Sequence, residues 1–256
     1  MSKRKKFIIT SVLLSLGFIG ISYIENQYRF VSIGTLSLLT IILFIWSLWE
    51  GLGKNMTLTT LLLPLLFTLG VGLFWFLLPA SIYARIPVLL FYGFGVYTLC
   101  LTANIYTVGA IRTIALLRAA RGVGFVFSLI TSFLLFDAIL SLRTNLLTTA
   151  AAAALVSFLI FFQGLWTIPL TKSTSKTFMM TTSIFSLIIA QIAISLYFWP
   201  VTVVVGSLFL TVAVYMLLGL GQAELEERLF PQTVREYLFV GLLVFIGMFI
   251  ATTWGA

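Results

Sequence analysis

The sequence predicts an all-helical protein that crosses a membrane about nine times, with its N-terminus inside and its C-terminus outside. Hydrophobic residues make up 61% of the 256 residues, charged residues make up 9%, and the mean hydropathy is +1.17. A water-soluble domain of this composition would expose a large apolar surface. The chain also divides into apolar runs of about 20 residues, the length that crosses a hydrocarbon core of about 30 Å.

Each apolar run predicts one helix, because a backbone in lipid must satisfy its own hydrogen bonds. In chain order the polar breaks between runs carry Arg29, Lys54, Arg85, Arg112 to Arg121, Arg143, Lys172 with Lys176, and Arg228 with Arg235. We expect a single integral membrane domain over residues 1–256. Its expected spans are 7–24, 30–49, 58–78, 87–108, 122–142, 146–166, 178–198, 201–220 and 237–254.

The first run also resembles a signal peptide, since a basic KRKK precedes it and Gly20 and Ser22 are small enough for a cleavage site. Its apolar stretch of about 18 residues is long for a signal core. We therefore expect it to be retained as a helix. Cleavage would leave eight spans.

The basic residues predict the orientation. If the N-terminus is cytoplasmic, twelve of the fifteen Lys and Arg residues fall on the cytoplasmic side, and only Arg29, Arg85 and Arg143 fall outside. All six tryptophans then lie at span ends, where indole rings prefer the membrane interface. We expect the protein in a cell membrane.

Composition also restricts the chemistry. The chain has no histidine and one cysteine, Cys100, so imidazole acid and base chemistry and an internal disulfide are excluded. The basic residues are spread over the spans and form no patch for nucleic acid. We expect no cofactor, no metal and no nucleic acid. The expected partners are membrane lipids, anionic headgroups on the cytoplasmic side, and either a protein partner or a second copy of the chain.

Four strongly polar side chains interrupt the apolar runs: Asn104, Asp137, Gln163 and Gln191. A charge at the bilayer centre costs about 2.5 to 3.5 kcal/mol on insertion scales, so each such residue needs a partner. Asn104 and Gln163 fall in the cytoplasmic half, and Asp137 and Gln191 fall in the outer half. We expect these two pairs, with Asp137 facing the helix bundle near Gln191 rather than lipid.

The segment IRTIALLRAARG, residues 111–122, carries Arg112, Arg118 and Arg121. One interpretation is a basic helix that lies on anionic headgroups or holds an acidic partner. The other, which we favour, is a loop whose charges only set the orientation.

The segment GQAELEERLFPQTVREYL, residues 221–238, predicts a short surface helix that Pro231 ends, with Glu224 and Arg228 paired four residues apart. Thr233 and Glu236 are then placed to cap the final span. The acidic residues Glu224, Glu226, Glu227 and Glu236 suit a partner or a divalent cation. We favour a solvated face, or pairing with the arginines of residues 111–122.

Two stretches carry a resemblance: FWPVTVVVGSLFLTVAVYMLLGLGQAELEERLFPQTVREYLFVGLLVFIGMFIATTWG and LLRAARGVGFVFSLITSFLLFDAILSLR. They resemble multi-pass proteins of unknown function from candidate-phylum bacteria, over about half the chain. The resemblance implies a bacterial cytoplasmic membrane. It brings no catalytic residue, because that family has no known activity.

Three functions remain. We favour a non-enzymatic membrane scaffold or assembly component, because the loops are short and no catalytic constellation is present. The alternative is a transporter of a small solute or ion that uses Asp137. An intramembrane lipid-processing enzyme comes third, because no two acidic residues have the sequence spacing of a metal-binding motif.

Overall fold

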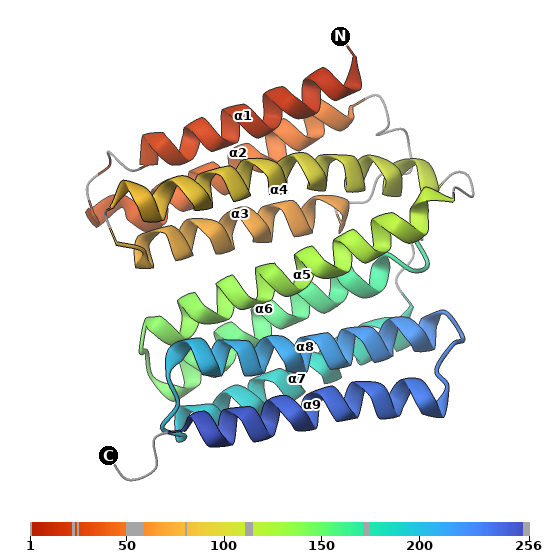
Figure 1. Cartoon of the computed structure of the whole chain (residues 1–256). Coiled ribbons are helices and arrows are strands. Elements are labelled where there is room, and N and C mark those ends of the chain that lie inside the picture. Colours follow the sequence, from red (N-terminus) through yellow and green to blue (C-terminus); the bar gives the residue numbers. More distant parts are fainter. Residues whose placement is uncertain are drawn as a thin grey trace. The chain divides into compact units, whose positions relative to one another are not determined.

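The computed structural model describes residues 2–21, 24, 26–49, 59–79, 81–110, 115–170 and 175–252. Within these ranges the regular structure is entirely helical, which confirms the predicted fold class (Figure 1). The short 3-10 helix Asn26–Tyr28 precedes α2. The α-helices are α1 Lys3–Ile21, α2 Arg29–Leu48, α3 Thr59–Leu77, α4 Ile82–Gly109, α5 Leu116–Ser141, α6 Leu146–Trp166, α7 Lys176–Tyr197, α8 Val203–Leu225 and α9 Pro231–Ala251.

Eight helices of the described chain, α2 to α9, are long and apolar enough to cross a membrane. The first helix, α1, is as long as α3 but is not among the eight, because the basic residues KRKK form its first turn. Each predicted span coincides with one helix, and the differences lie at the ends. For example, α4 begins five residues before its predicted span and includes Arg85. Polar residues end an apolar run, but a helix continues through them into the membrane interface.

The chain folds into two compact units, Met1–Phe127 and Ser128–Ala256, which we call the N-terminal and C-terminal units. Helix α5 contributes to both. The prediction of one membrane domain concerns how these units associate and stays a prediction.

In the N-terminal unit, α1 packs on α2, α2 on α3, α3 on α4, and α4 back on α1 (Figure 1). Tyr92 of α4 lies at its centre, with the ring of Phe18 edge-on at 4.4 Å and that of Phe67 stacked at 5.8 Å. A buried hydroxyl chain joins three helices, since Thr68 lies 3.1 Å from both Tyr92 and Thr40. These contacts satisfy polar groups where water is absent.

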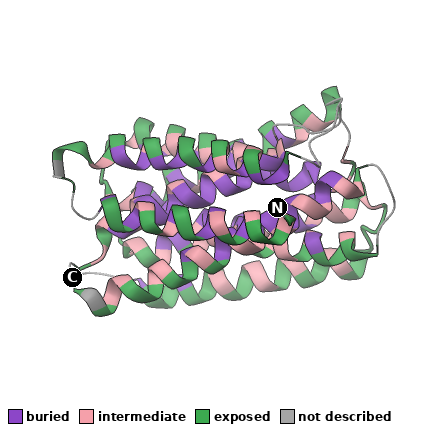
Figure 2. Cartoon of the chain, turned by 90° about the horizontal axis from the view of Figure 1, so that it is seen from above, coloured by how far each residue is buried: buried purple, intermediate pink, exposed green. Residues whose placement is uncertain are grey.

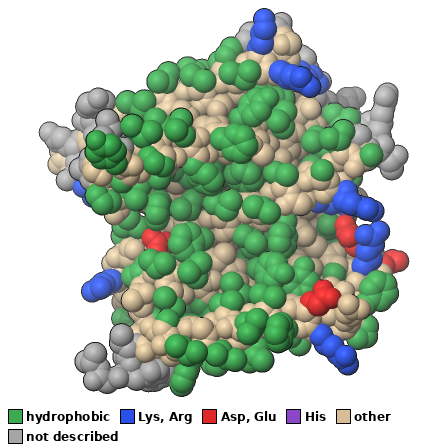
Figure 3. Space-filling model, in the orientation of Figure 1, with side chains coloured by type: hydrophobic (Ala, Val, Ile, Leu, Met, Phe, Trp, Pro, Cys, Tyr) green, Lys and Arg blue, Asp and Glu red, His purple; other side chains and the backbone are tan. Residues whose placement is uncertain are grey.

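In the C-terminal unit, α6 packs along α7, both contact α8, and α9 lies against α8. The sides of the helices that face one another are buried, and the outer sides are exposed (Figure 2). Hydrophobic side chains cover the middle of the helices on the face in Figure 3, and Lys and Arg lie toward the helix ends. This distribution suits a bilayer, whose centre is apolar and whose two surfaces are charged.

Candidate functional site

Asp137 lies on α5, four residues before the helix ends at Ser141, and only 6% of it is exposed. Its Oδ1 accepts a hydrogen bond of 3.4 Å from the Oγ of Ser207 on α8. The same hydroxyl lies 2.9 Å from the carbonyl of Val203 and 3.0 Å from that of Val204. Because a hydroxyl has a single hydrogen, the three acceptors compete, and the bond to Asp137 is the longest of them.

Asp137 therefore faces the helix bundle, as we expected, but Ser207 rather than Gln191 lies beside it. Gln191 is exposed on α7, although the depth argument had paired it with Asp137. Sequence reasoning missed Ser207, yet a signal was present. Ser207 lies four residues from the end of α8 that begins at Val203, so its depth equals that of Asp137 in α5.

A pocket of about 630 Å³ opens at this end of the C-terminal unit, which we call the α5–α6 pocket. Leu140 and Val203 line it, and each lies one helical turn from a member of the Asp137 and Ser207 pair. One turn is about 5 Å of helix, so the buried pair lies directly beneath the pocket wall.

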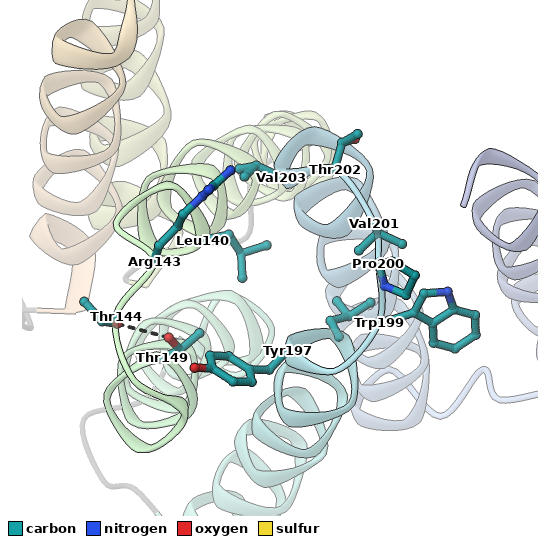
Figure 4. A pocket seen from close by; sticks show the side chains of 11 residues that line it. Leu140, Arg143, Thr144, Thr149, Tyr197, Trp199, Pro200, Val201, Thr202 and Val203 are labelled. Carbon is teal, nitrogen blue, oxygen red and sulfur yellow. Dashed lines mark hydrogen bonds between the residues drawn. The ribbon is translucent and has the colours of Figure 1, made fainter. Parts of the chain in front are cut away.

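The rim of the α5–α6 pocket is polar (Figure 4). Thr144 and Thr149 are hydrogen-bonded at 3.0 Å, and the ring of Tyr197 points toward them. Arg143 extends from the turn after α5 toward Val203. Its φ of 46° is in the left-handed region that favours glycine, so an arginine there is strained by about 1 kcal/mol or more.

Two helices also begin at this rim. Asn145 caps α6 by accepting a 2.8 Å hydrogen bond from the amide of Thr148. Thr202 caps α8 by accepting one of 3.4 Å from the amide of Val205. Helix N-termini carry partial positive charge. Helices α5 and α7 end at the same rim, so the partial charges of the helix ends offset one another, and Arg143 is the one charged side chain among the described lining residues.

The second predicted pair, Asn104 and Gln163, is divided between the two units. Gln163 on α6 is 2% exposed, and its Oε1 lies 3.5 Å from the Oγ of Ser128, a residue the sequence argument did not use. Asn104 is half-buried on α4 in the N-terminal unit. Their pairing stays a prediction.

The short surface helix predicted within residues 221–238 is wrong. Helix α8 continues to Leu225, and Pro231 begins α9 instead of ending a helix. A proline suits the first helical position, where its missing N–H is not needed. The cap predicted for α9 is also wrong, because Phe230 is the N-cap and Glu236 accepts a hydrogen bond from Gln232.

The acidic residues lie around the turn that ends α8. Glu224 is exposed in the last helical turn, and Glu227 is exposed with a φ of 57°. Arg228 pairs with Glu226 at 3.7 Å rather than with Glu224 as predicted, because the helix has already ended. Glu224 and Glu227 line a second pocket of about 870 Å³, which we call the acidic pocket. Pairing of these acids with the arginines of residues 111–122 stays a prediction.

The loop that we favoured for residues 111–122 is wrong for residues 116–122, which form the beginning of α5, whereas residues 111–114 lie outside the described part of the chain. Arg118 is exposed and Arg121 is half-buried in the first turns of α5, whereas Arg112 lies outside the described residues. The hydroxyl of Tyr106 on α4 donates a 2.9 Å hydrogen bond to the carbonyl of Ala120. This part of the segment therefore belongs to an apolar helix that is anchored on α4.

A family model described as "Protein of unknown function (DUF5656)" matches residues 49–251. The chain belongs to this family. No curated protein and no protein of solved structure matches the chain. The matched region of the DUF5656 chain contains both pockets, Asp137 and Ser207, whereas α1 precedes it.

The family description gives no activity, so it assigns no role to any residue of this DUF5656 protein. Among the described residues, no group of three or more His, Cys, Asp or Glu side chains comes together to hold a metal ion. What the geometry offers is a buried carboxyl group beneath one pocket, two carboxylates at another, and the exposed last helix α9.

Proposed function

We propose that this integral membrane protein is a non-enzymatic scaffold or assembly component, and that α9 binds a transmembrane helix of a protein partner or of a second copy. One observation carries the proposal. Only 6% of the apolar stretch of α9 is buried, against 33% or more in each of the seven other helices that could span a membrane. Lipid covers an exposed apolar surface just as a partner helix does. The residues on the open side of α9 therefore distinguish the two.

One narrow side of α9 already contacts α8. Met248 is the only buried residue within the helix. The side chain of Met216 fills the space beside Gly241, and the ring of Tyr237 fills that beside Gly219. At the far end, Trp199 donates a 3.0 Å hydrogen bond to Thr252. These contacts fix α9 in place and leave its other sides exposed.

The open side of α9 carries two small residues one helical turn apart, Gly247 and Ala251, both exposed. A Cβ added at Gly247 would meet no atom within 4 Å. Small residues four apart let transmembrane helices approach closely, and in lipid such packing is a main source of helix association. The space beside Gly247 is unfilled within the described chain, which supports a partner helix.

The test is association in native lipid. The protein would be extracted with its surrounding lipid into nanodiscs, and its bound proteins and its copy number would be measured. We expect Gly247→Leu to lose the partner or the second copy, because the larger side chain separates the two helices. Gly20→Leu is the matched control, since a Cβ at Gly20 on α1 also meets nothing within 4 Å.

A wild-type protein that is monomeric and free of other proteins in these nanodiscs would contradict the proposal. Equal association in Gly247→Leu and Gly20→Leu would place the contact elsewhere and contradict it as well.

A second function, transport of an ion or a small solute, is favoured by the place of Asp137. A carboxyl group buried in a membrane protein is costly, and such groups commonly serve ion or proton paths. Asp137 lies one helical turn, about 5 Å along α5, from Leu140 in the wall of a pocket that opens at the helix ends.

Transport would be measured as proton or cation flux into sealed proteoliposomes. We expect Asp137→Asn to reduce the flux to the level of protein-free vesicles, because the amide keeps the shape but carries no charge. Gln191→Ala, on the exposed side of α7, serves as the control and leaves the flux unchanged. Equal flux in wild type and Asp137→Asn would exclude this function.

We also propose that the protein lies in a bacterial cytoplasmic membrane with its N-terminus in the cytoplasm. The distribution of basic residues in the sequence supports this orientation. In that orientation the exposed Arg118 lies near anionic cytoplasmic headgroups, and the α5–α6 pocket faces the outside.

A further inference from the structure

The acidic pocket is an apolar hollow with carboxylates at its edge. Three helices form it: the end of α6, the beginning of α7 and the end of α8. Its wall is largely hydrophobic, with Trp166, Phe178 and Phe185 among the lining side chains. Its volume of about 870 Å³ lies within the range of about 300 to 1,000 Å³ found for small-molecule sites.

Two acidic side chains, Glu224 and Glu227, line this pocket, and none of its described lining residues is basic. The nearest arginine along the chain, Arg228, pairs with Glu226, which does not line the pocket. Helices α6 and α8 end here, whereas α7 begins here and α9 begins at Pro231, two residues after the lining residue Leu229, so the partial charges of the helix ends offset one another. The exposed Lys176 lies between the lining residues Ser175 and Thr177, so the pocket is apolar with one electronegative edge, formed by Glu224 and Glu227.

The turn after α8 fixes the backbone of Glu227 at the edge of the pocket. The amide of Arg228 donates to the carbonyl of Ala223 at 2.8 Å, and the amide of Glu227 donates to that of Glu224 at 3.0 Å. This pair of bonds ends a helix with one residue in the left-handed conformation, normally glycine. Here the residue is Glu227, with a φ of 57°. A charged side chain thus occupies a position where glycine would be more stable.

Glycine is instead used where the pocket needs close packing. A Cβ at Gly221 would lie 2.8 Å from Cδ2 of Leu165 and 2.8 Å from the ring of Phe185. The missing side chain lets the ring of Phe185 reach α8, and a second ring, Phe161, holds it edge-on at 5.4 Å. The aromatic part of the wall is therefore fixed in place.

We propose that the acidic pocket binds a lipophilic organic cation, with its hydrophobic body against the aromatic wall and its positive charge near Glu224 and Glu227. Aromatic faces attract cations, and carboxylates complement the charge. An anion or a neutral lipid would leave the two carboxylates without a counter-charge. This site is independent of α9 and of Asp137, so a negative result here would not affect the proposed functions.

The experiment uses the full chain in nanodiscs of phosphatidylcholine, with tetraphenylphosphonium as the probe and empty nanodiscs subtracted. We expect saturable binding of tetraphenylphosphonium and no saturable binding of tetraphenylborate, which has the same shape and the opposite charge. The double variant Glu224→Gln, Glu227→Gln should bind the cation about tenfold more weakly, because both counter-charges are lost.

Two further variants sharpen the result. Glu236→Gln removes one acidic charge outside the pocket lining and should bind as the wild type does. Thr181→Trp keeps both carboxylates but fills the pocket from α7, and it should abolish binding. Equal binding of the cation and the anion, unchanged affinity in the double variant, or binding no greater than in empty nanodiscs would overturn the proposal.

Discussion

At the scale of single residues, Asp137 and Gln191 show that the sequence determines how deep a side chain lies along its helix but not to which side of the helix it points. The distance of each from its helix end was readable, and the burial of Asp137 follows from the cost of a carboxylate in lipid. The direction in which a side chain points around the helix was not readable. Gln191 is exposed, whereas its neighbours Ile189, Ala190 and Ala193 are buried. An amide is neutral, so lipid exposure costs it less than it costs a carboxylate.

The bond between Ser207 and Asp137 gives a prediction at this scale. Ser207→Ala should lower the free energy of unfolding by about 1 kcal/mol, because it leaves a buried carboxyl group without its partner. In an Asp137→Ala background the same substitution should cost almost nothing. Unfolding in mixed micelles at increasing denaturing detergent measures both values and their coupling.

Ser195→Ala is the matched control, since its hydroxyl is exposed and donates only within α7. A Ser207→Ala cost that is the same in both backgrounds would show that the two side chains are not coupled.

At the scale of elements, the sequence predicted every helix but placed some ends wrongly. A bilayer fixes the length of an apolar run, so nine runs gave nine helices within the described chain. The end of α8 and the beginning of α9 were missed because a proline can follow one helix or start the next. The charges near Pro231 suit a helix that ends there as well as a helix that begins there. Only the backbone hydrogen bonds of the turn after α8 distinguish the two.

Close packing between elements predicts a strong effect at Gly95 on α4. A Cβ there would lie 2.7 Å from the ring of Phe67, which is fully buried, and 3.1 Å from that of Phe127. Gly95→Ala should therefore destabilise the protein by about 1 to 3 kcal/mol, since a buried ring must move. Thermal unfolding measures the change, with Gly20→Ala as a control that meets no neighbour. Equal melting temperatures for the two variants would contradict this packing.

At the scale of the whole molecule, the sequence determined the class of protein but not the packing of its helices. In a chain that is 61% hydrophobic, the sides of a helix that face lipid and the sides that face another helix are equally apolar. The closed order of α1 to α4 and the one-sided contact of α9 could therefore not be read from hydropathy. Both pockets escaped prediction for the same reason. They lie at opposite ends of the C-terminal unit, with α6, α7 and α8 between them.

The central proposal is the alternate threading of these helices, which would place the α5–α6 pocket outside and the acidic pocket in the cytoplasm. The single cysteine, Cys100, is fully buried, so it gives little background in labelling. Leu142 and Phe230 are exposed in the connections before α6 and after α8. In intact cells a membrane-impermeant maleimide should label Leu142→Cys, and it should label Phe230→Cys only after the membrane is opened. Labelling of both positions in intact cells would contradict three crossings between them, and with it the threading.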